Sequence, residues 1–132
     1  MMKVRDVMIS IGNFPVVSQK TILKEALTEM GEANLGLVCI VNESQELLGL
    51  ITDGDLRRKL LKVQKPFSAF FVDDALIHSK REPITCFSTD NLKEVVQLMG
   101  KKQIWDIPVV SQNNKLVGLL HLHPAVKKIL DG

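Results

Sequence analysis

Leu47-Leu48-Gly49-Leu50-Ile51 is repeated 69 positions later (116 − 47 = 69) as Leu116-Val117-Gly118-Leu119-Leu120. The same offset aligns residues 15–63 with 84–132 without a gap, and Met30-Gly31 then lies over Met99-Gly100. A fixed offset with matching apolar character is typical of a structural unit that has been duplicated. The sequence therefore predicts two copies of one supersecondary unit.

Each copy begins with a short strand and an amphipathic helix. The apolar residues at helical spacing are Leu23, Ala26, Leu27 and Met30 in the first copy and Leu92, Val95, Val96 and Met99 in the second. This spacing places one apolar stripe on each helix. Thr21 and Asp90 precede the stripes and are the predicted N-caps.

A hairpin and a closing helix follow in each copy. Residues 37–41 and 107–110 are continuous apolar runs, which are typical of strands covered on both faces. Polar turns at 42–46 and 111–115 lead into the returning strands. Gly49 and Gly118 recur inside these strands, where a missing side chain permits close approach of a backbone or a ligand.

The predicted fold is α/β (α+β), with two β-α-β-β-α repeats packed around a pseudo-twofold axis. Residues 1–63 are the predicted first domain, 64–83 a linker and lead-in, and 84–132 the second domain. Phe67, Phe70 and Phe71 lie in the linker, where we expect a short helix that covers an edge of the core. Neither copy alone buries enough apolar surface to be stable, so the two are expected to pack together.

Composition excludes several classes of protein. The 132 residues include 17 Lys and Arg against 15 Asp and Glu, and 45% are apolar. Because the charges are interspersed, neither nucleic acid nor a membrane surface is an expected partner. Cys39 and Cys86 lie in separate apolar runs and are interpreted as buried thiols. With no secretory signal and no apolar stretch long enough to span a bilayer, the expected location is the cytoplasm.

The repeat resembles the cystathionine-β-synthase (CBS) domain, which occurs in tandem as a Bateman module. The resemblance rests on residues 4–8, 41–42 and 49–56 in the first copy and on residues 107–111 and 116–120 in the second. Residues 8–15, 35–37, 52–58 and 120–123 are similar to the C-terminal CBS pair of KpsF/GutQ-type D-arabinose-5-phosphate isomerases, enzymes of Kdo and lipopolysaccharide biosynthesis. Residues 52–58 also resemble CBS pairs attached to sugar nucleotidyltransferases.

The isomerase resemblance implies a sugar isomerase (SIS) domain in the parent chain, which this sequence does not contain. The chain is therefore expected to be a regulatory region or a freestanding regulator, and not an enzyme by itself. We identify no catalytic residue, because no nucleophile and base form a recognisable pair.

The resemblance implies that Thr52 and Asp55 hold the ribose and phosphate of a nucleotide at the start of the last helix. Arg57 and Arg58 would contact phosphate, although adjacent helical positions point about 100° apart. The family pattern implies apolar walls for a base, formed by Val16, Val17, Gly36, Leu37 and Val38. The alternative is purely structural, because Thr52-x-x-Asp55 is also an acidic variant of a helix capping box.

The second copy departs from this pattern, since His121 and Pro124 stand at the Thr52 and Asp55 positions. We expect one good site, with His121 able to meet an anionic ligand group in the other copy. No metal site is expected at Asp53 and Asp55, nor at His121 and His123, because further ligands are not evident. Trp105 and Asp106 precede the apolar strand where a pocket rim would lie.

Two functional hypotheses remain open. In the first, the pair senses a nucleotide or sugar nucleotide, for which the pathway product CMP-Kdo is one candidate, and modulates an attached arabinose-5-phosphate isomerase. In the second, it is a ligand-independent dimerisation module of that enzyme or of a sugar nucleotidyltransferase. Its homodimer seam would then carry Leu56, Leu60 and Leu61 or Val126, Ile129 and Leu130. No cofactor is required beyond the effector.

Overall fold

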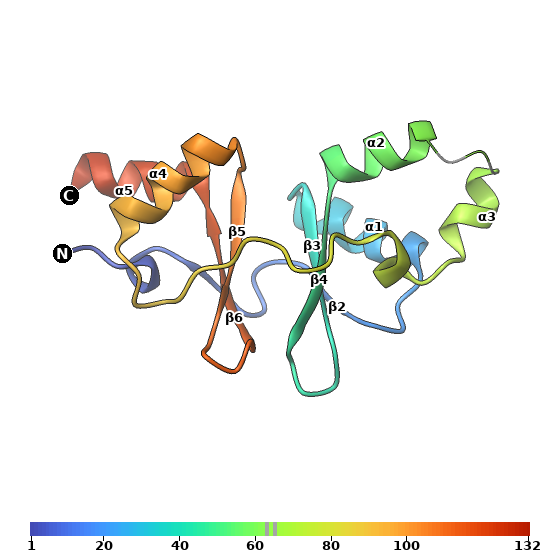
Figure 1. Cartoon of the computed structure of the whole chain (residues 1–132), viewed down its shortest axis with the longest axis horizontal. Coiled ribbons are helices and arrows are strands. Elements are labelled where there is room, and N and C mark those ends of the chain that lie inside the picture. The colour runs from blue at the N-terminus through green and yellow to red at the C-terminus, as the bar shows by residue number, and fades with distance from the viewer. Residues whose placement is uncertain (63, 65) are drawn as a thin grey trace. The chain divides into compact units, whose positions relative to one another are not determined.

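The computed structural model describes residues 1–62, 64 and 66–132. The predicted end of the first repeat at residue 63, and residue 65 of the predicted linker, lie outside the described residues. Two three-stranded sheets with helices against them form the fold (Figure 1), which confirms the predicted α/β class. The chain divides into two compact units, one of residues 14–83 and one of residues 1–13 with 84–132. The expected twofold packing of the repeats stays a prediction.

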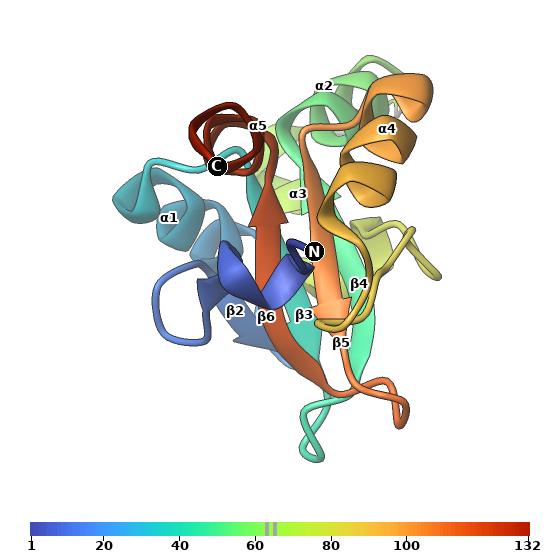
Figure 2. The same ribbon diagram turned by 90° about the vertical axis from the view of Figure 1, so that its left-hand side faces the viewer.

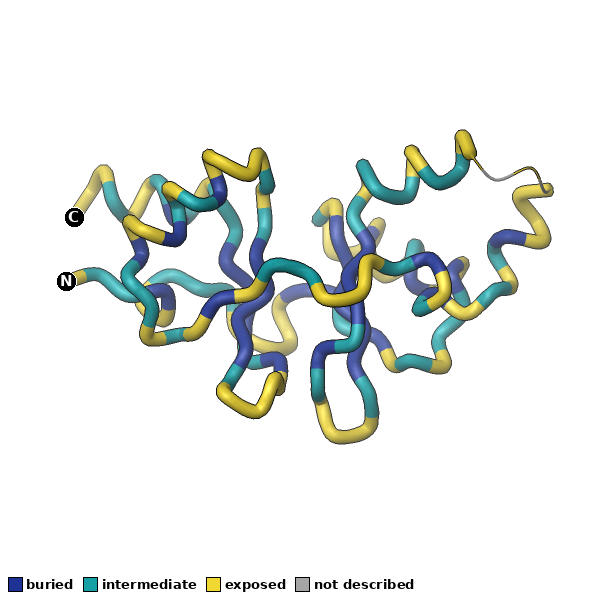
Figure 3. Tube along the Cα trace, in the orientation of Figure 1, coloured by how far each residue is buried: buried dark blue, intermediate teal, exposed yellow. Residues whose placement is uncertain are grey.

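The unit of residues 14–83 is built on the sheet β2-β3-β4. Its elements are β2 (Val16–Ser18), α1 (Leu23–Ala33), β3 (Leu37–Val41), β4 (Leu47–Thr52), α2 (Asp53–Lys62), α3 (Phe67–Phe71) and the 3-10 helix η2 (Ala75–His78). The central strand β3 pairs parallel with β2 and antiparallel with β4. All of β3 is buried (Figure 3), as its continuous apolar run predicts.

The core of this unit lies between the sheet and its helices. α1 contributes Leu23, Ala26 and Met30, which confirms the predicted stripe, and β3 contributes Val38 and Ile40. Leu27, Leu56 and Leu60 pack against this core and stay partly exposed. α2 buries none of its residues fully, so it is the least covered of the long helices.

The other unit is built on the sheet β1-β6-β5. Its elements are the 3-10 helix η1 (Val4–Asp6), β1 (Ile9–Ser10), α4 (Leu92–Lys102), β5 (Asp106–Val110), β6 (Leu116–His121) and α5 (Leu122–Asp131). α4 and α5 lie side by side against one face of the sheet (Figure 2). Leu92, Val95 and Met99 are buried there, as predicted for the second helix.

The two sequence repeats exchange the segments that lead into them, so each compact unit contains one repeat and the segment that precedes the other repeat in the sequence. Residues 2–4 bond to residues 90–92, so the N-terminal lead-in packs with the second repeat. Residues 73–75 bond to residues 21–23 of the first repeat in the same way. The predicted domain ranges follow the sequence repeat, whereas the compact units follow this packing. The first strand of the second repeat is reduced to a single bridge between Cys86 and Val109.

Close packing of the exchanged lead-in segments accounts for both repeated glycines. A Cβ on Gly49 would lie 2.8 Å from the Cβ of Ser79, and a Cβ on Gly118 would lie 2.8 Å from the Sδ of Met8. These separations are too short for ordinary van der Waals contact. Close approach of the lead-in segments therefore explains why glycine stands at both positions, without a ligand.

The two predicted N-caps were wrong, and the predicted aromatic cover is confirmed only in part. α1 is capped at Ile22 and α4 at Asn91, each one residue after the predicted Thr21 and Asp90. The Leu23 N–H at the start of α1 donates to the Asp73 carbonyl, so a tertiary partner replaces a side-chain cap. Phe67 is 62% exposed, while Phe70 is buried, so only part of the predicted aromatic cover reaches the core.

Candidate functional site

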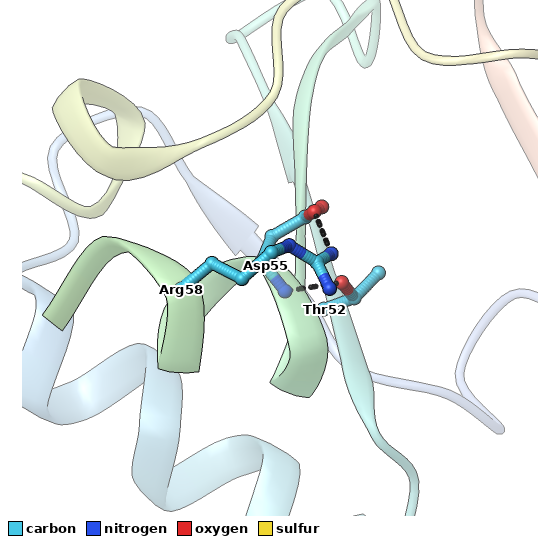
Figure 4. Close-up of polar contacts among 3 residues, drawn as sticks. All are labelled: Thr52, Asp55 and Arg58. Atoms are coloured by element: carbon cyan, nitrogen blue, oxygen red, sulfur yellow. Dashed lines mark hydrogen bonds and ion pairs between the residues drawn. The ribbon is translucent and has the colours of Figure 1, made fainter. Parts of the chain in front are cut away.

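The junction between β4 and α2 holds the predicted Thr52 and Asp55. The Asp55 N–H donates to Thr52 Oγ1 at 3.1 Å, so the Thr52 hydroxyl caps the first turn of α2 (Figure 4). The Asp53 N–H donates to the Gly36 carbonyl at 2.9 Å, which fixes the start of α2 beside the start of β3. The structural alternative weighed for Thr52 is therefore present, and a ligand role remains compatible with it.

The Asp55 carboxylate is paired with Arg58. Arg58 Nη2 lies 2.7 Å from Asp55 Oδ1, and the Arg58 side chain turns back toward the start of the helix (Figure 4). The side chains are 58% and 36% exposed, respectively, so solvent screens the pair and it contributes little stability. Arg57 is exposed on the same helix. The structure thus brings Thr52, Asp55 and Arg58 together.

Gly36 lies close to the Asp53 side chain at the same junction. A Cβ at residue 36 would lie 2.8 Å from Asp53 Oδ2, so a side chain there would displace the Asp53 carboxylate. Leu37 directly follows and stands opposite Thr52 in the β3–β4 register. Both residues are therefore adjacent to the candidate site, with Leu37 fully buried.

Of the three valines predicted to form an apolar wall for a base, Val17 and Val38 lie in the core and Val16 is half-buried. Val17 and Val38 belong to the core cluster packed beneath the helices. Val16 is half-buried and stands opposite Cys39 in the parallel pairing of β2 with β3. Packing accounts for Val17 and Val38, and a contact of any of the three with a base stays a prediction.

The β6–α5 junction of the other unit repeats the backbone with different chemistry. The Leu122 N–H donates to the Trp105 carbonyl at 2.9 Å, which corresponds to the Asp53–Gly36 bond under the 69-residue offset. His121 Nδ1 lies 2.6 Å from Asp106 Oδ1. Burial raises the pKa of Asp106, while the hydrogen bond and charge of His121 act in the opposite direction. Trp105 is 71% exposed beside this pair.

The sequence interpretation missed the partner of His121. Asp106 and His121 face each other in the β5–β6 register, which the lengths of the two strands and their turn would have predicted once the bulge at Val109 and Val110 was allowed for. It also missed a second pair, in which His78 Nε2 lies 2.8 Å from Asp73 Oδ2. His78 is buried and stacks on Phe70 with ring centroids 4.0 Å apart, which indicates a packing role.

The two histidines of the second repeat differ in their surroundings. Within residues 1–62, 64 and 66–132, no three His, Cys, Asp or Glu side chains gather where they could hold a metal ion. His121 is engaged by Asp106, and His123 is exposed on the first turn of α5.

In the same described ranges, no helix has the length and apolar character needed to cross a membrane.

The fold and the two equivalent junctions define a protein built from two copies of one sheet-and-helix unit. The CBS domain family matches residues 4–62 and 72–123. These two segments account for most of the sequence, and the chain therefore belongs to the CBS domain family.

Curated relatives extend over most of this chain. An uncharacterized protein of Helicobacter pylori is 34% identical over 122 residues, which are 92% of this chain and 35% of that protein. The arabinose 5-phosphate isomerase KdsD of Yersinia pestis is 28% identical and matches 96% of this chain and 37% of its own length. The chain thus spans about a third of the length of these two relatives.

Solved structures share the fold along almost the whole chain. The crystal structure of CBSX2 in complex with AMP has a TM-score of 0.86 at 24% identity and covers 99% of this chain and 98% of that one. The CBS domain pair of MJ0100, in complex with 5'-methylthioadenosine and S-adenosyl-L-methionine, has a TM-score of 0.78 at 21% identity. That match covers 100% of this chain and 98% of the other. At these identities the likeness establishes the fold.

Proposed function

We propose that the chain is a regulatory CBS pair that binds a nucleotide or sugar nucleotide at the β4–α2 junction. The observation that carries the proposal is the convergence of Thr52, Asp55 and Arg58 on the first turn of α2. An ionised carboxylate accepts hydrogen bonds from two ribose hydroxyls, and a guanidinium matches a phosphate. The AMP and S-adenosyl-L-methionine complexes of the two CBS structures are consistent with ligands of this class.

The helix start contributes less to anion binding than its position suggests. The Asp53 N–H donates to Gly36 and the Asp55 N–H donates to Thr52, so two amides of the first turn already have acceptors. The helix dipole still favours negative charge here. Direct hydrogen bonds to a ligand phosphate would therefore come mainly from Arg58, with Arg57 as a second cation.

A panel of ligands tests the proposal. Isothermal titration calorimetry of the chain with AMP, ADP, ATP, CMP, CMP-Kdo and sugar phosphates is expected to detect at least one ligand. Asp55→Asn keeps the size of the side chain but loses the carboxylate, and it should weaken that ligand about tenfold. Asp131→Asn, which removes an exposed carboxylate at the end of α5, is the matched control and should bind as the wild type does. Failure of every ligand to bind would remove the proposal.

The finer proposal concerns the parent protein. Similarity to KdsD supports an origin beside an SIS isomerase domain, with CMP-Kdo as a candidate effector that modulates arabinose-5-phosphate isomerisation. A ligand changes activity only as far as it prefers one arrangement of the module over another. Binding of CMP-Kdo in the panel above, with no change in isomerase activity of the full-length parent, would contradict this regulation.

A second candidate function is homodimerisation without a ligand, for which the exposed ends of two helices provide the specific observation. Leu61 is 80% exposed on α2 and Leu130 is 79% exposed on α5, whereas Leu56, Leu60 and Ile129 are partly used by the cores. Light scattering distinguishes the two functions. A stable dimer unchanged by every ligand supports the dimerisation module, and a ligand-dependent mass supports the sensor.

A further inference from the structure

The Asp55–Arg58 ion pair occupies the carboxylate that the proposed function assigns to a ligand. A Cβ built on Gly54 would lie 3.3 Å from both Nη1 and Nη2 of Arg58, so the guanidinium lies directly over the first turn of α2. Its Nη2 contacts Asp55 Oδ1 at 2.7 Å. The cation thus lies against the helix start, between the Asp55 carboxylate and Gly54.

The Asp55–Arg58 ion pair should weaken the binding of ligands that carry a diol alone more than the binding of ligands that also carry a phosphate. A vicinal diol that donates one hydroxyl hydrogen to each oxygen of the Asp55 carboxylate has to share Oδ1 with Arg58, whose Nη2 lies 2.7 Å from that oxygen. A ligand with a diol alone competes with Arg58 for Oδ1 and offers Arg58 no new anion. A ligand with a diol and a phosphate supplies a new partner to both residues.

We propose that Arg58 is a specificity-determining residue that exchanges Asp55 for the ligand's phosphate on binding. The site then selects ligands that carry vicinal hydroxyls together with an anionic group, and it discriminates against the corresponding nucleosides. This inference rests on the proposed function, because it concerns the same site. It adds the reason for the selection, which is competition between Arg58 and the ligand hydroxyls for one carboxylate.

The second repeat provides an internal contrast. The 69-residue offset places Pro124 at the position of Asp55 and Lys127 at the position of Arg58 (55 + 69 = 124; 58 + 69 = 127). No carboxylate is present at position 124, so the exchange belongs to the first repeat. Lys127 is exposed on α5 and offers a matched position at which to remove one positive charge.

Calorimetry with AMP and adenosine tests the exchange, using the wild type, Arg58→Gln and Lys127→Gln. We expect the wild type to bind AMP more tightly than adenosine. In Arg58→Gln, AMP should bind about fivefold or more weakly because a charged hydrogen-bond donor to phosphate is lost. Adenosine should bind about two- to fivefold more tightly, because Asp55 is released from an exposed ion pair. Lys127→Gln should match the wild type with both ligands.

Each contrary result has a distinct meaning. If the wild type binds AMP but Arg58→Gln weakens AMP without strengthening adenosine, Arg58 contacts phosphate and the exchange is overturned. If Arg58→Gln binds both ligands as the wild type does, the inference is overturned while the proposed function stands. If the wild type binds neither these two probes nor any ligand of the panel, both fall. Arg58→Lys, which keeps the charge and loses the planar fork, should give an intermediate ratio of the two affinities.

Discussion

His121 Nδ1 and Asp106 Oδ1 lie 2.6 Å apart on facing residues of β6 and β5. The same register in the first repeat places Thr52 opposite Leu37, where no such pair can form. The duplicated backbone therefore carries a helix-capping hydroxyl in one copy and a histidine–carboxylate pair in the other. The two junctions therefore differ in their chemistry, even though their backbones correspond residue by residue.

Asp106→Asn is expected to change how stability depends on pH. Burial raises the pKa of Asp106 above its ordinary value of 3.8, so the folded chain holds this proton more tightly than the unfolded chain. The associated stability is fully present below the unfolded pKa and is lost as pH rises through the raised folded value. Asn does not ionise. The unfolding free energy of Asp106→Asn relative to the wild type should therefore increase from about pH 3 to pH 6, as measured by urea denaturation.

The opposing effect of His121 gives this measurement its contrary outcome. If the wild type gains stability over Asp106→Asn as pH rises, attraction between Asp106 and His121 exceeds the cost of burying the carboxylate. Asp131→Asn, at an exposed carboxylate of α5, is the control. Its unfolding free energy should change with pH in the same way as that of the wild type across the same range.

Thr52→Ala should lower the unfolding free energy by about 1 kcal/mol, because it removes the hydroxyl that accepts from the Asp55 N–H. Thr52→Ser keeps an acceptor at the same place and should retain most of this stability. Urea denaturation of the three proteins provides the comparison. Equal destabilisation by Ala and Ser would show that the Thr52 methyl group, and not its hydroxyl, is what stabilises the junction.

The sheets and helices could be predicted because their signals are local. The apolar run 37–41 is buried along its whole length, and its turn at 42–46 closes as expected, with Asn42 Oδ1 accepting from the Ser44 and Glu46 N–H groups. A strand covered on both faces needs apolar residues at every position, so a single stretch of sequence reveals it. The junction that follows β4 was instead located through the family resemblance of residues 49–56.

Features that depend on distant partners could not be predicted from local pattern. Thr21 has the chemistry of an N-cap, yet the Leu23 N–H donates to the Asp73 carbonyl, and the N-cap residue is Ile22, which makes no side-chain cap. The Asp55–Arg58 pair was also missed, although three residues separate its members, because both side chains had been assigned to a ligand. The exchange of the lead-in segments could not be predicted either, because the alignment of the two repeats contains no information on which lead-in packs with which repeat.

Gly49→Ala should destabilise the unit of residues 14–83 by about 1–3 kcal/mol, the usual cost of inserting a methyl group into a packed position. The added Cβ would collide with the Oγ of Ser79 and lie 2.8 Å from the Ser79 Cβ. Ser79→Gly removes both atoms, so the double variant should recover part of the loss. A double-mutant cycle measured by urea denaturation gives the coupling. Additive effects would mean that the Ser79 contact is not the source of the strain.

Cys86 should resist alkylation as long as the chain is folded. The thiol is buried, and burial, helped by the charge of Asp90, raises its pKa from 9.0 to about 12. Because the thiolate is the nucleophile, a rise of three pKa units lowers the reactive fraction about a thousandfold at pH 8. Iodoacetamide labelling followed by peptide mass spectrometry should therefore modify the Cys86 peptide only within the urea unfolding transition. Asp90→Asn removes the smaller cause and should accelerate labelling modestly, since burial remains. Rapid modification of Cys86 in the native wild type would show that the N-terminal lead-in and α4 do not protect this thiol as the structure indicates.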